Sequence, residues 1–252
     1  MRRFVNPGNT AFEVAVNSQI YVDKTGLLAY TNSVINTKQA LICSSRPRRF
    51  GKSITADMLC AYYSRGCDSD SIFASYEIAK SDSYKKHLNQ YDVLKINMQD
   101  FLSESQSIEE MLAHLTACLI RDLKNGFPQI DFSYAKSLVS VMREVFAQTG
   151  RSFIILIDEW DCLFREYESN KEAQKQYLDF LRVWLKDKEY VGLAYMTGIL
   201  PIKKYGSHSA LNMFTEYSMT NPREMAGYFG FTEDEVNMLC ETYQRSFDET
   251  QA

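Results

Sequence analysis

The chain contains 252 residues, of which 45% are hydrophobic, 13% are aromatic and 24% are charged. This composition is typical of a folded globular protein and excludes wholesale disorder, and the length suits one large α/β domain, with or without a small appendage. The formal net charge of -4 argues against a globally basic protein that coats nucleic acid. A local basic patch remains compatible with this balance.

The sequence argues against a membrane-spanning protein, a secreted protein and a disulfide-stabilised protein. The longest strongly apolar run, Phe153 to Ile157, is too short to span a bilayer. The N-terminus carries two arginines but lacks the apolar stretch of a signal peptide. The six cysteines are scattered without a CxxC pair, which favours reduced thiols over a zinc site or a disulfide framework. We therefore expect a cytoplasmic protein with no membrane partner.

Apolar strand-like runs alternate with amphipathic helical runs along the chain. Two helix starts carry a capping-box pair, Ser107 with Glu110 and Thr232 with Glu235. The alternation predicts an α/β fold with a mostly parallel sheet. In chain order we expect a strand at 39–45, a helix from Ile54 to about Gly66, a strand at 93–98, a helix at 107–123, a helix from Tyr134 to Gly150, a strand at 153–157, a helix at 177–185, a strand at 191–196 and a helix from Thr232.

The segment RPRRFGKS follows the first expected strand and opens the first of these helices. This is the context of a phosphate-binding loop (Walker A), where backbone N–H groups at a helix N-terminus hold phosphate oxygens. Lys52 would reach the β- and γ-phosphates, and the hydroxyl of Ser53 would ligate Mg²⁺. The alternative is a loop tip with a solvated lysine, since Arg46 replaces the first glycine of the motif. The expected nucleotide-binding residues are Arg46, Pro47, Arg48, Arg49, Phe50, Gly51, Lys52, Ser53 and Ile54.

An acidic doublet ends the third expected strand, FIILI. Ligands bind at the carboxyl ends of strands in open α/β sheets. We expect Asp158 to bind Mg²⁺ through water and Glu159 to polarise the attacking water (Walker B). A solvated acidic turn after a core strand is the alternative. Asp161 could support the metal shell or pair with an arginine of the phosphate loop.

Further polar residues complete the expected site. Thr197 ends the fourth strand and would sense the γ-phosphate or orient water, although it equally fits a strand end before a glycine turn. An arginine that reaches the γ-phosphate often comes from a neighbouring subunit. Arg48, Arg49 and Arg223 are candidates, and the sequence does not choose between them. The basic loop is also compatible with a nucleic acid or a partner subunit.

Four motifs together resemble a known family. They are YVDKTGLL (21–28), RPRRFGKS (46–53), IILIDEWD (154–161) and MTGILPI (196–202). Their order and spacing are similar to those of the AAA-ATPase-like domain family, whose members commonly carry a PD-(D/E)XK nuclease-like domain after the ATPase domain. The resemblance covers residues 4–235. It implies a three-layer α/β/α P-loop NTPase core of the additional-strand class, with ATP and Mg²⁺ as cofactors. An arginine at the first loop position is typical of the family.

The resemblance also implies residue roles and a division of the chain. Lys52 and Ser53 would contact phosphate and Mg²⁺, Asp158 would bind Mg²⁺ and Glu159 would be the base. Residues 1–230 would form the ATPase-like domain, in which the DKT segment, Asp23 to Thr25, folds over the nucleotide side. Asp23 equally fits a helix N-cap. Residues 231–252 would be the helical start of a truncated lid or C-terminal region.

Two functions follow, with a third held open. The first is Mg²⁺-dependent binding and hydrolysis of ATP, favoured by the intact Asp158-Glu159 pair. The second is a non-hydrolysing nucleotide switch that regulates a partner or nuclease-like domain, favoured by the truncated end and by the lack of an assured arginine finger. A nucleic-acid-handling module is the third. ATP rather than GTP rests on the resemblance, and self-association or a partner domain stays open.

Overall fold

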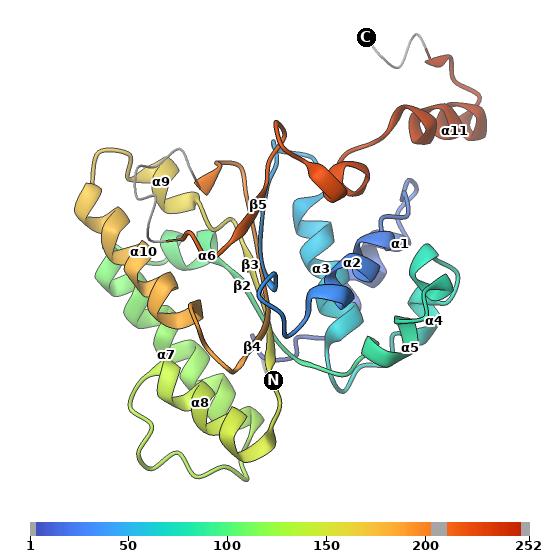
Figure 1. The fold of residues 1–252 in the computed structure, drawn as a ribbon. Coiled ribbons are helices and arrows are strands. Elements are labelled where there is room, and N and C mark those ends of the chain that lie inside the picture. Colours follow the sequence, from blue (N-terminus) through green and yellow to red (C-terminus); the bar gives the residue numbers. More distant parts are fainter. Residues whose placement is uncertain (1–3, 203–210, 248–252) are drawn as a thin grey trace.

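A five-stranded, wholly parallel sheet forms the centre of the computed structural model, which describes residues 4–202 and 211–247 (Figure 1). The strand order is β2-β3-β4-β1-β5. The strands are β1 (Leu41–Ser45), β2 (Asp92–Asn97), β3 (Phe153–Asp158), β4 (Val191–Gly198) and β5 (Thr215–Tyr217).

Helices cover both faces of the sheet and complete three layers (Figure 1). One face carries α1 (Thr10–Val16), α2 (Gly26–Val34), α3 (Lys52–Tyr63), α4 (Asp70–Phe73) and α5 (Tyr84–His87). The other carries α6 (Met98–Ser103), α7 (Ile108–Gly126), α8 (Leu138–Thr149), α9 (Cys162–Glu166) and α10 (Lys171–Leu185). The 3₁₀ helices η1 (Glu77–Lys80) and η3 (Arg223–Tyr228) and the outlying α11 (Glu233–Tyr243) lie on the same side of the sheet as α3 (Figure 1).

The strand β4 lies between β1 and β3, so one strand separates the phosphate loop from the acidic doublet. Ser45 pairs with Gly198, and Ile157 pairs with Met196. This arrangement confirms the expected additional-strand α/β/α architecture. It also brings the carboxyl ends of β1, β3 and β4 to one edge of the sheet.

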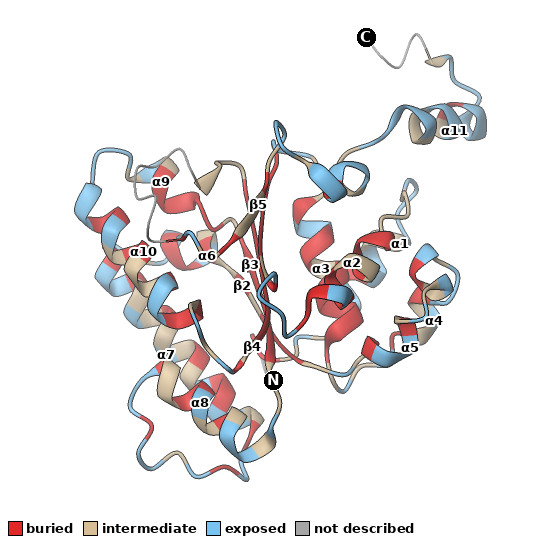
Figure 2. Ribbon diagram, viewed as in Figure 1, coloured by how far each residue is buried: buried red, intermediate tan, exposed pale blue. Residues whose placement is uncertain are grey.

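The apolar run of β3 is buried on both faces, as its uniform composition indicates. Phe153, Ile155 and Ile157 pack into the cluster under α7, α8 and α10. Ile154 and Leu156 pack into the opposite cluster, under α2 and α3. Figure 2 shows the sheet as a buried layer between the partly exposed helices. The acidic doublet therefore follows a strand that is fixed from both sides.

Several local expectations need correction. The hydroxyl of Ser107 accepts a hydrogen bond from the Glu110 N–H at 3.2 Å, but the Glu110 carboxylate accepts from the Gln106 N–H at 2.8 Å, so only half of that capping box forms. The Thr232 box is complete. Tyr134 is 90% exposed, and α8 begins four residues later because Ser137 caps it.

One residue of α3 departs from the buried face that helical spacing predicts for Ile54, Met58, Leu59 and Tyr62. Ile54 is 45% exposed, whereas Thr55, Met58 and Leu59 are buried. Asp23 does not cap α2: Thr25 is the N-cap, and Asp23 Oδ1 accepts a hydrogen bond from its N–H at 2.8 Å. Residues 248–252 of the expected C-terminal region lie outside the described residues.

Candidate nucleotide-binding site

The loop between β1 and α3 leaves backbone donors at the start of a buried helix. Gly51 is the N-cap of α3 and has φ +76°, in the left-handed region that favours glycine. Within the described residues, the N–H groups of Gly51 to Ile54 donate no hydrogen bond. Unpaired donors and the positive end of the helix dipole make this N-terminus suited to an anion.

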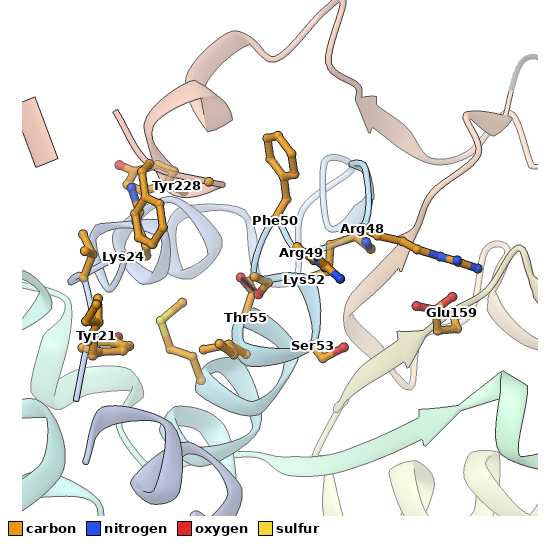
Figure 3. Close-up of a pocket in the computed structure, with 17 residues that line it drawn as sticks. Tyr21, Lys24, Arg48, Arg49, Phe50, Lys52, Ser53, Thr55, Glu159 and Tyr228 are labelled. Atoms are coloured by element: carbon orange, nitrogen blue, oxygen red, sulfur yellow. Dashed lines mark hydrogen bonds between the residues drawn. The ribbon is translucent and has the colours of Figure 1, made fainter. Parts of the chain in front are cut away.

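A solvent-open cavity of about 400 Å³ lies directly over these donors (Figure 3). Three segments distant in sequence form its walls: the phosphate loop with the first turns of α3, the segment before α2, and the segment before α11. Glu159 closes one end. The lining residues are Ile20, Tyr21, Val22, Lys24, Arg48, Arg49, Phe50, Gly51, Lys52, Ser53, Ile54, Thr55, Met58, Glu159, Tyr228, Gly230 and Phe231.

Lys52 is only 6% exposed, and its ammonium donates a hydrogen bond to the carbonyl of Pro47 at 2.9 Å. Burial lowers the pKa of Lys52, while the nearby carboxylates of Glu159 and Asp158 oppose that shift. The lysine thus spans the phosphate loop and lies within the field of the acidic doublet. A phosphate in the cavity would offer this partly desolvated cation a better partner than a neutral carbonyl does.

Asp158 is held at the end of β3 by two donors. Its Oδ1 accepts hydrogen bonds from the Glu159 N–H at 2.9 Å and from the Thr197 hydroxyl at 3.2 Å. Asp158 and Thr197 are both buried, and neither lines the cavity. The Thr197 side chain therefore reaches across from β4 to orient Asp158.

Glu159 adopts φ +52° and points its carboxylate into the cavity wall. Its Oε2 forms an ion pair with Nη2 of Arg165 on α9. The Arg165 Nε lies 3.6 Å from Oδ2 of Asp161. That same oxygen accepts hydrogen bonds from the Ile199 and Leu200 N–H groups at 3.0 and 2.8 Å. Asp161 therefore pairs with Arg165, not with an arginine of the phosphate loop, and fixes the turn after β4.

The arginines of the loop are divided between two environments. Arg46 is 2% exposed, and its Nη1 donates to the carbonyls of Ser45 at 3.0 Å and Tyr217 at 2.6 Å. It lies outside the cavity lining. Arg48 and Arg49 are exposed and line the cavity. Arg223, at the start of η3, does not line it.

The DKT segment connects the cavity to two other parts of the fold. Asp23 Oδ2 accepts a hydrogen bond from the Glu77 N–H at 2.8 Å, which fixes the segment to η1. Lys24 lines the cavity and donates to the Gly227 carbonyl at 2.8 Å and to both carboxylate oxygens of Glu235 at 2.5 and 2.7 Å. The family resemblance carried by the motif YVDKTGLL had already implied that this segment folds over the nucleotide side. No local pattern indicated Tyr228, Phe231 or Arg165.

The donor set fits Mg²⁺ bound together with phosphate. Ser53 supplies a hydroxyl that lines the cavity, and Asp158 supplies a carboxylate whose Oδ2 accepts no hydrogen bond from the described residues. Mg²⁺ prefers oxygen ligands and keeps water and phosphate oxygens in its shell. The described residues contain no cluster of three or more His, Cys, Asp or Glu side chains that could hold a metal ion.

Comparisons with known proteins identify the family of this chain. The family described as Predicted AAA-ATPase matches residues 8–207, so the chain belongs to that family. A protein of Azotobacter chroococcum mcd 1, described as "Uncharacterized protein in vnfD 5'region", is 24% identical over 224 residues, which are 87% of this chain and 41% of the relative. The chain thus spans less than half of that relative. Among solved structures, C. elegans PCH-2 is similar with a TM-score of 0.39 and 12% identity, over 93% of this chain and 51% of that one.

In the described parts of the chain, every helix is too short or too polar to cross a bilayer.

Proposed function

We propose that this member of the Predicted AAA-ATPase family binds ATP in the cavity over α3 and hydrolyses it in a Mg²⁺-dependent reaction. One observation carries the proposal: unpaired N–H donors and Lys52 share a cavity with Glu159, which follows the neighbouring acidic strand end. A phosphate-binding helix and a carboxylate base are the two parts that hydrolysis of a nucleoside triphosphate needs.

In this proposal the phosphates lie across the N-terminus of α3. The N–H groups of Gly51 to Ile54 would donate to phosphate oxygens, and the Lys52 ammonium would exchange the Pro47 carbonyl for the β- and γ-phosphates. Arg48 and Arg49, on the exposed rim, would add positive charge. These groups stabilise the charge that develops on the transferred phosphoryl group.

The opposite end of the cavity suits a purine base. Tyr21 and Tyr228 lie at that end, away from Glu159 (Figure 3), and Met58 and Phe231 add apolar surface to the lining. Such walls bury a flat ring, while the few polar groups fix its orientation. We assign adenine on the family membership, because no guanine-reading NKxD element occurs in the sequence.

Hydrolysis would use the acidic edge of the sheet. A Mg²⁺ ion held by Ser53 and, through water, by Asp158 would neutralise phosphate charge. Thr197 would keep Asp158 in place through its hydroxyl. The Glu159 carboxylate would accept a proton from a water molecule as the water oxygen attacks the γ-phosphorus. The bond to the bridging oxygen then breaks and ADP leaves.

Phosphate release from ATP, with fluorescent-nucleotide binding measured in parallel, tests the proposal. Lys52→Ala should weaken nucleotide binding at least about tenfold, because it removes the buried cation from the phosphates. Glu159→Gln should retain binding and lose about 100-fold in turnover, the lower range for a general base. Lys38→Ala and Glu172→Gln, at exposed positions outside the cavity lining, are matched controls. Unchanged turnover in Glu159→Gln would refute the assigned base.

A nucleotide switch is the second candidate, and the contacts of Lys24 favour it. This residue lines the cavity and also binds Glu235 of α11, so occupancy of the cavity and the placement of α11 share one side chain. We would assign residues 231–252 to the start of a region that receives this signal. Nucleotide binding without turnover, accompanied by changed hydrogen exchange in α11, would support the switch over the ATPase.

A further inference from the structure

We propose that Arg165 is a positioning residue for the water-activating carboxylate of Glu159. The inference rests on the proposed ATPase function and adds a residue that no sequence motif indicated. Arg165 lies on α9, one turn after the acidic doublet, and does not line the cavity. It would act through Glu159 and not through the nucleotide.

The guanidinium of Arg165 bridges a fixed carboxylate and a movable one. Asp161 is fully buried, and its Oδ2 is held by the N–H groups of Ile199 and Leu200. Arg165 Nε lies 3.6 Å from this oxygen, and Arg165 Nη2 pairs with Glu159 Oε2. The anchored Asp161 thus sets where the guanidinium lies, and the guanidinium sets where the Glu159 carboxylate lies.

Glu159 needs such support because of its position. Its side chain is 25% exposed at one end of the cavity, and its own backbone has φ +52° and lies outside the β3 ladder. A general base must lie within hydrogen-bond reach of the water that it deprotonates. Arg165 holds Oε2, whereas Oε1 accepts no hydrogen bond from the described residues. One oxygen is therefore anchored and the other is free for water.

Charge balance points in the same direction. Asp158, Glu159 and Asp161 place three carboxylates within four residues of sequence, and all three act on the ammonium of Lys52. Like charges at such spacing repel one another. The guanidinium between Glu159 and Asp161 offsets this repulsion and keeps the Glu159 side chain from turning out to solvent.

The test combines substitutions at Arg165 with the Glu159→Gln background. Steady-state phosphate release gives kcat, and a fluorescent ATP analogue gives Kd. Arg165→Ala should lower kcat about 10- to 100-fold, the loss that a misplacement of roughly 1 Å produces, with Kd changed less than twofold. Arg165→Lys should recover part of kcat. Arg165→Ala should add no further loss to Glu159→Gln, because the two residues act as a unit.

Arg182→Ala is the matched control, since Arg182 forms an exposed ion pair with Asp179 on α10. A rise in kcat on Arg165→Ala would overturn the inference, because it would show that the ion pair inhibits Glu159 instead of positioning it. An equal loss of kcat in the wild-type and Glu159→Gln backgrounds, together with weaker binding of the ATP analogue, would also overturn the inference, because it would indicate that Arg165 contacts phosphate directly. If Arg165→Ala does not fold, the lysine variant carries the same comparison. Absence of wild-type turnover overturns the proposed hydrolysis and this inference together, whereas unchanged kcat in folded Arg165→Ala overturns the inference alone.

Discussion

Replacement of Arg46 by alanine tests whether the first residue of the phosphate loop binds nucleotide or holds the fold. Arg46 is 2% exposed, and its guanidinium joins two strands through the carbonyls of Ser45 and Tyr217. Its Cζ lies 5.0 Å above the ring of Phe229. Arg46 therefore connects β1, β5 and the segment before α11, and we expect its loss to affect stability first.

The magnitude follows from these contacts. A hydrogen bond from a charged donor contributes roughly 1.5–3 kcal/mol, and a shielded cation–π contact about 0.5–2 kcal/mol. These contributions share one side chain and do not add fully, so we expect Arg46→Ala to lower the free energy of unfolding by about 2–4 kcal/mol. For a chain of 150–250 residues each kcal/mol shifts Tm by about 2–4 °C, which gives a decrease of roughly 5–15 °C.

Urea denaturation and thermal melting of the nucleotide-free protein measure the loss, and a fluorescent ATP analogue measures binding. Arg49→Ala is the matched control, because Arg49 is exposed and lines the cavity. It should keep the stability within about 0.5 kcal/mol and weaken nucleotide binding. The reasoning is refuted if Arg46→Ala melts like wild type and binds nucleotide poorly, since that result would place Arg46 on the phosphates.

Three further predictions concern the edges of the site. A Cβ on Gly198 would lie 2.6 Å from Asp161 Oδ1, so Gly198→Ala should lower stability by about 1–3 kcal/mol and reduce phosphate release, whereas Gly227→Ala, with nothing within 4 Å, should melt like wild type. Burial lowers the pKa of Lys52, so the native state releases this proton at a lower pH than the unfolded state does, and the native state gains stability as pH rises towards the ordinary value of about 10.4. Lys52→Met should therefore have a Tm no lower than that of wild type at pH 7, and any excess in its Tm should shrink up to pH 10. An excess that grows with pH would contradict this reasoning. Lys24→Met removes a largely buried ion pair to α11, and should speed hydrogen exchange in α11 and weaken analogue binding several-fold, unlike the exposed Lys85→Met.

The parts of the fold that local sequence encodes were predictable. The strand FIILI is apolar throughout because both of its faces are buried, and helix periods identified α7, α8 and α10. The place of the loop 46–51 between a strand and a helix was predictable because the three segments are contiguous in sequence. The expectation of an additional-strand core came from the family resemblance, and the register of β4 between β1 and β3 confirms it.

Contacts that depend on tertiary structure were not predictable. Arg46 matched a phosphate-loop position in sequence, but its environment is set by β5 and Phe229, which pattern analysis did not place. The three residues of β5 are too few to show a period. From the sequence, only the arginines of the phosphate loop were candidate partners of Asp161. Its partner in the structure, Arg165, becomes a neighbour because α9 begins directly after Asp161.

The walls of the cavity include segments that belong to neither the phosphate loop nor the acidic doublet. The phosphate loop and the acidic doublet both follow strand ends at the edge of the sheet where β1, β3 and β4 end together. The remaining wall consists of the segments before α2 and before α11, which Lys24 and Glu235 join across 211 positions of sequence. In the proposed function, a nucleotide that fills the cavity would contact both the sheet edge and a wall that Lys24 holds through Glu235 and the Gly227 carbonyl. Because the second wall leads into α11, we predict that a difference between ATP and ADP in the cavity would reach α11 through contacts that include the Lys24–Glu235 ion pair.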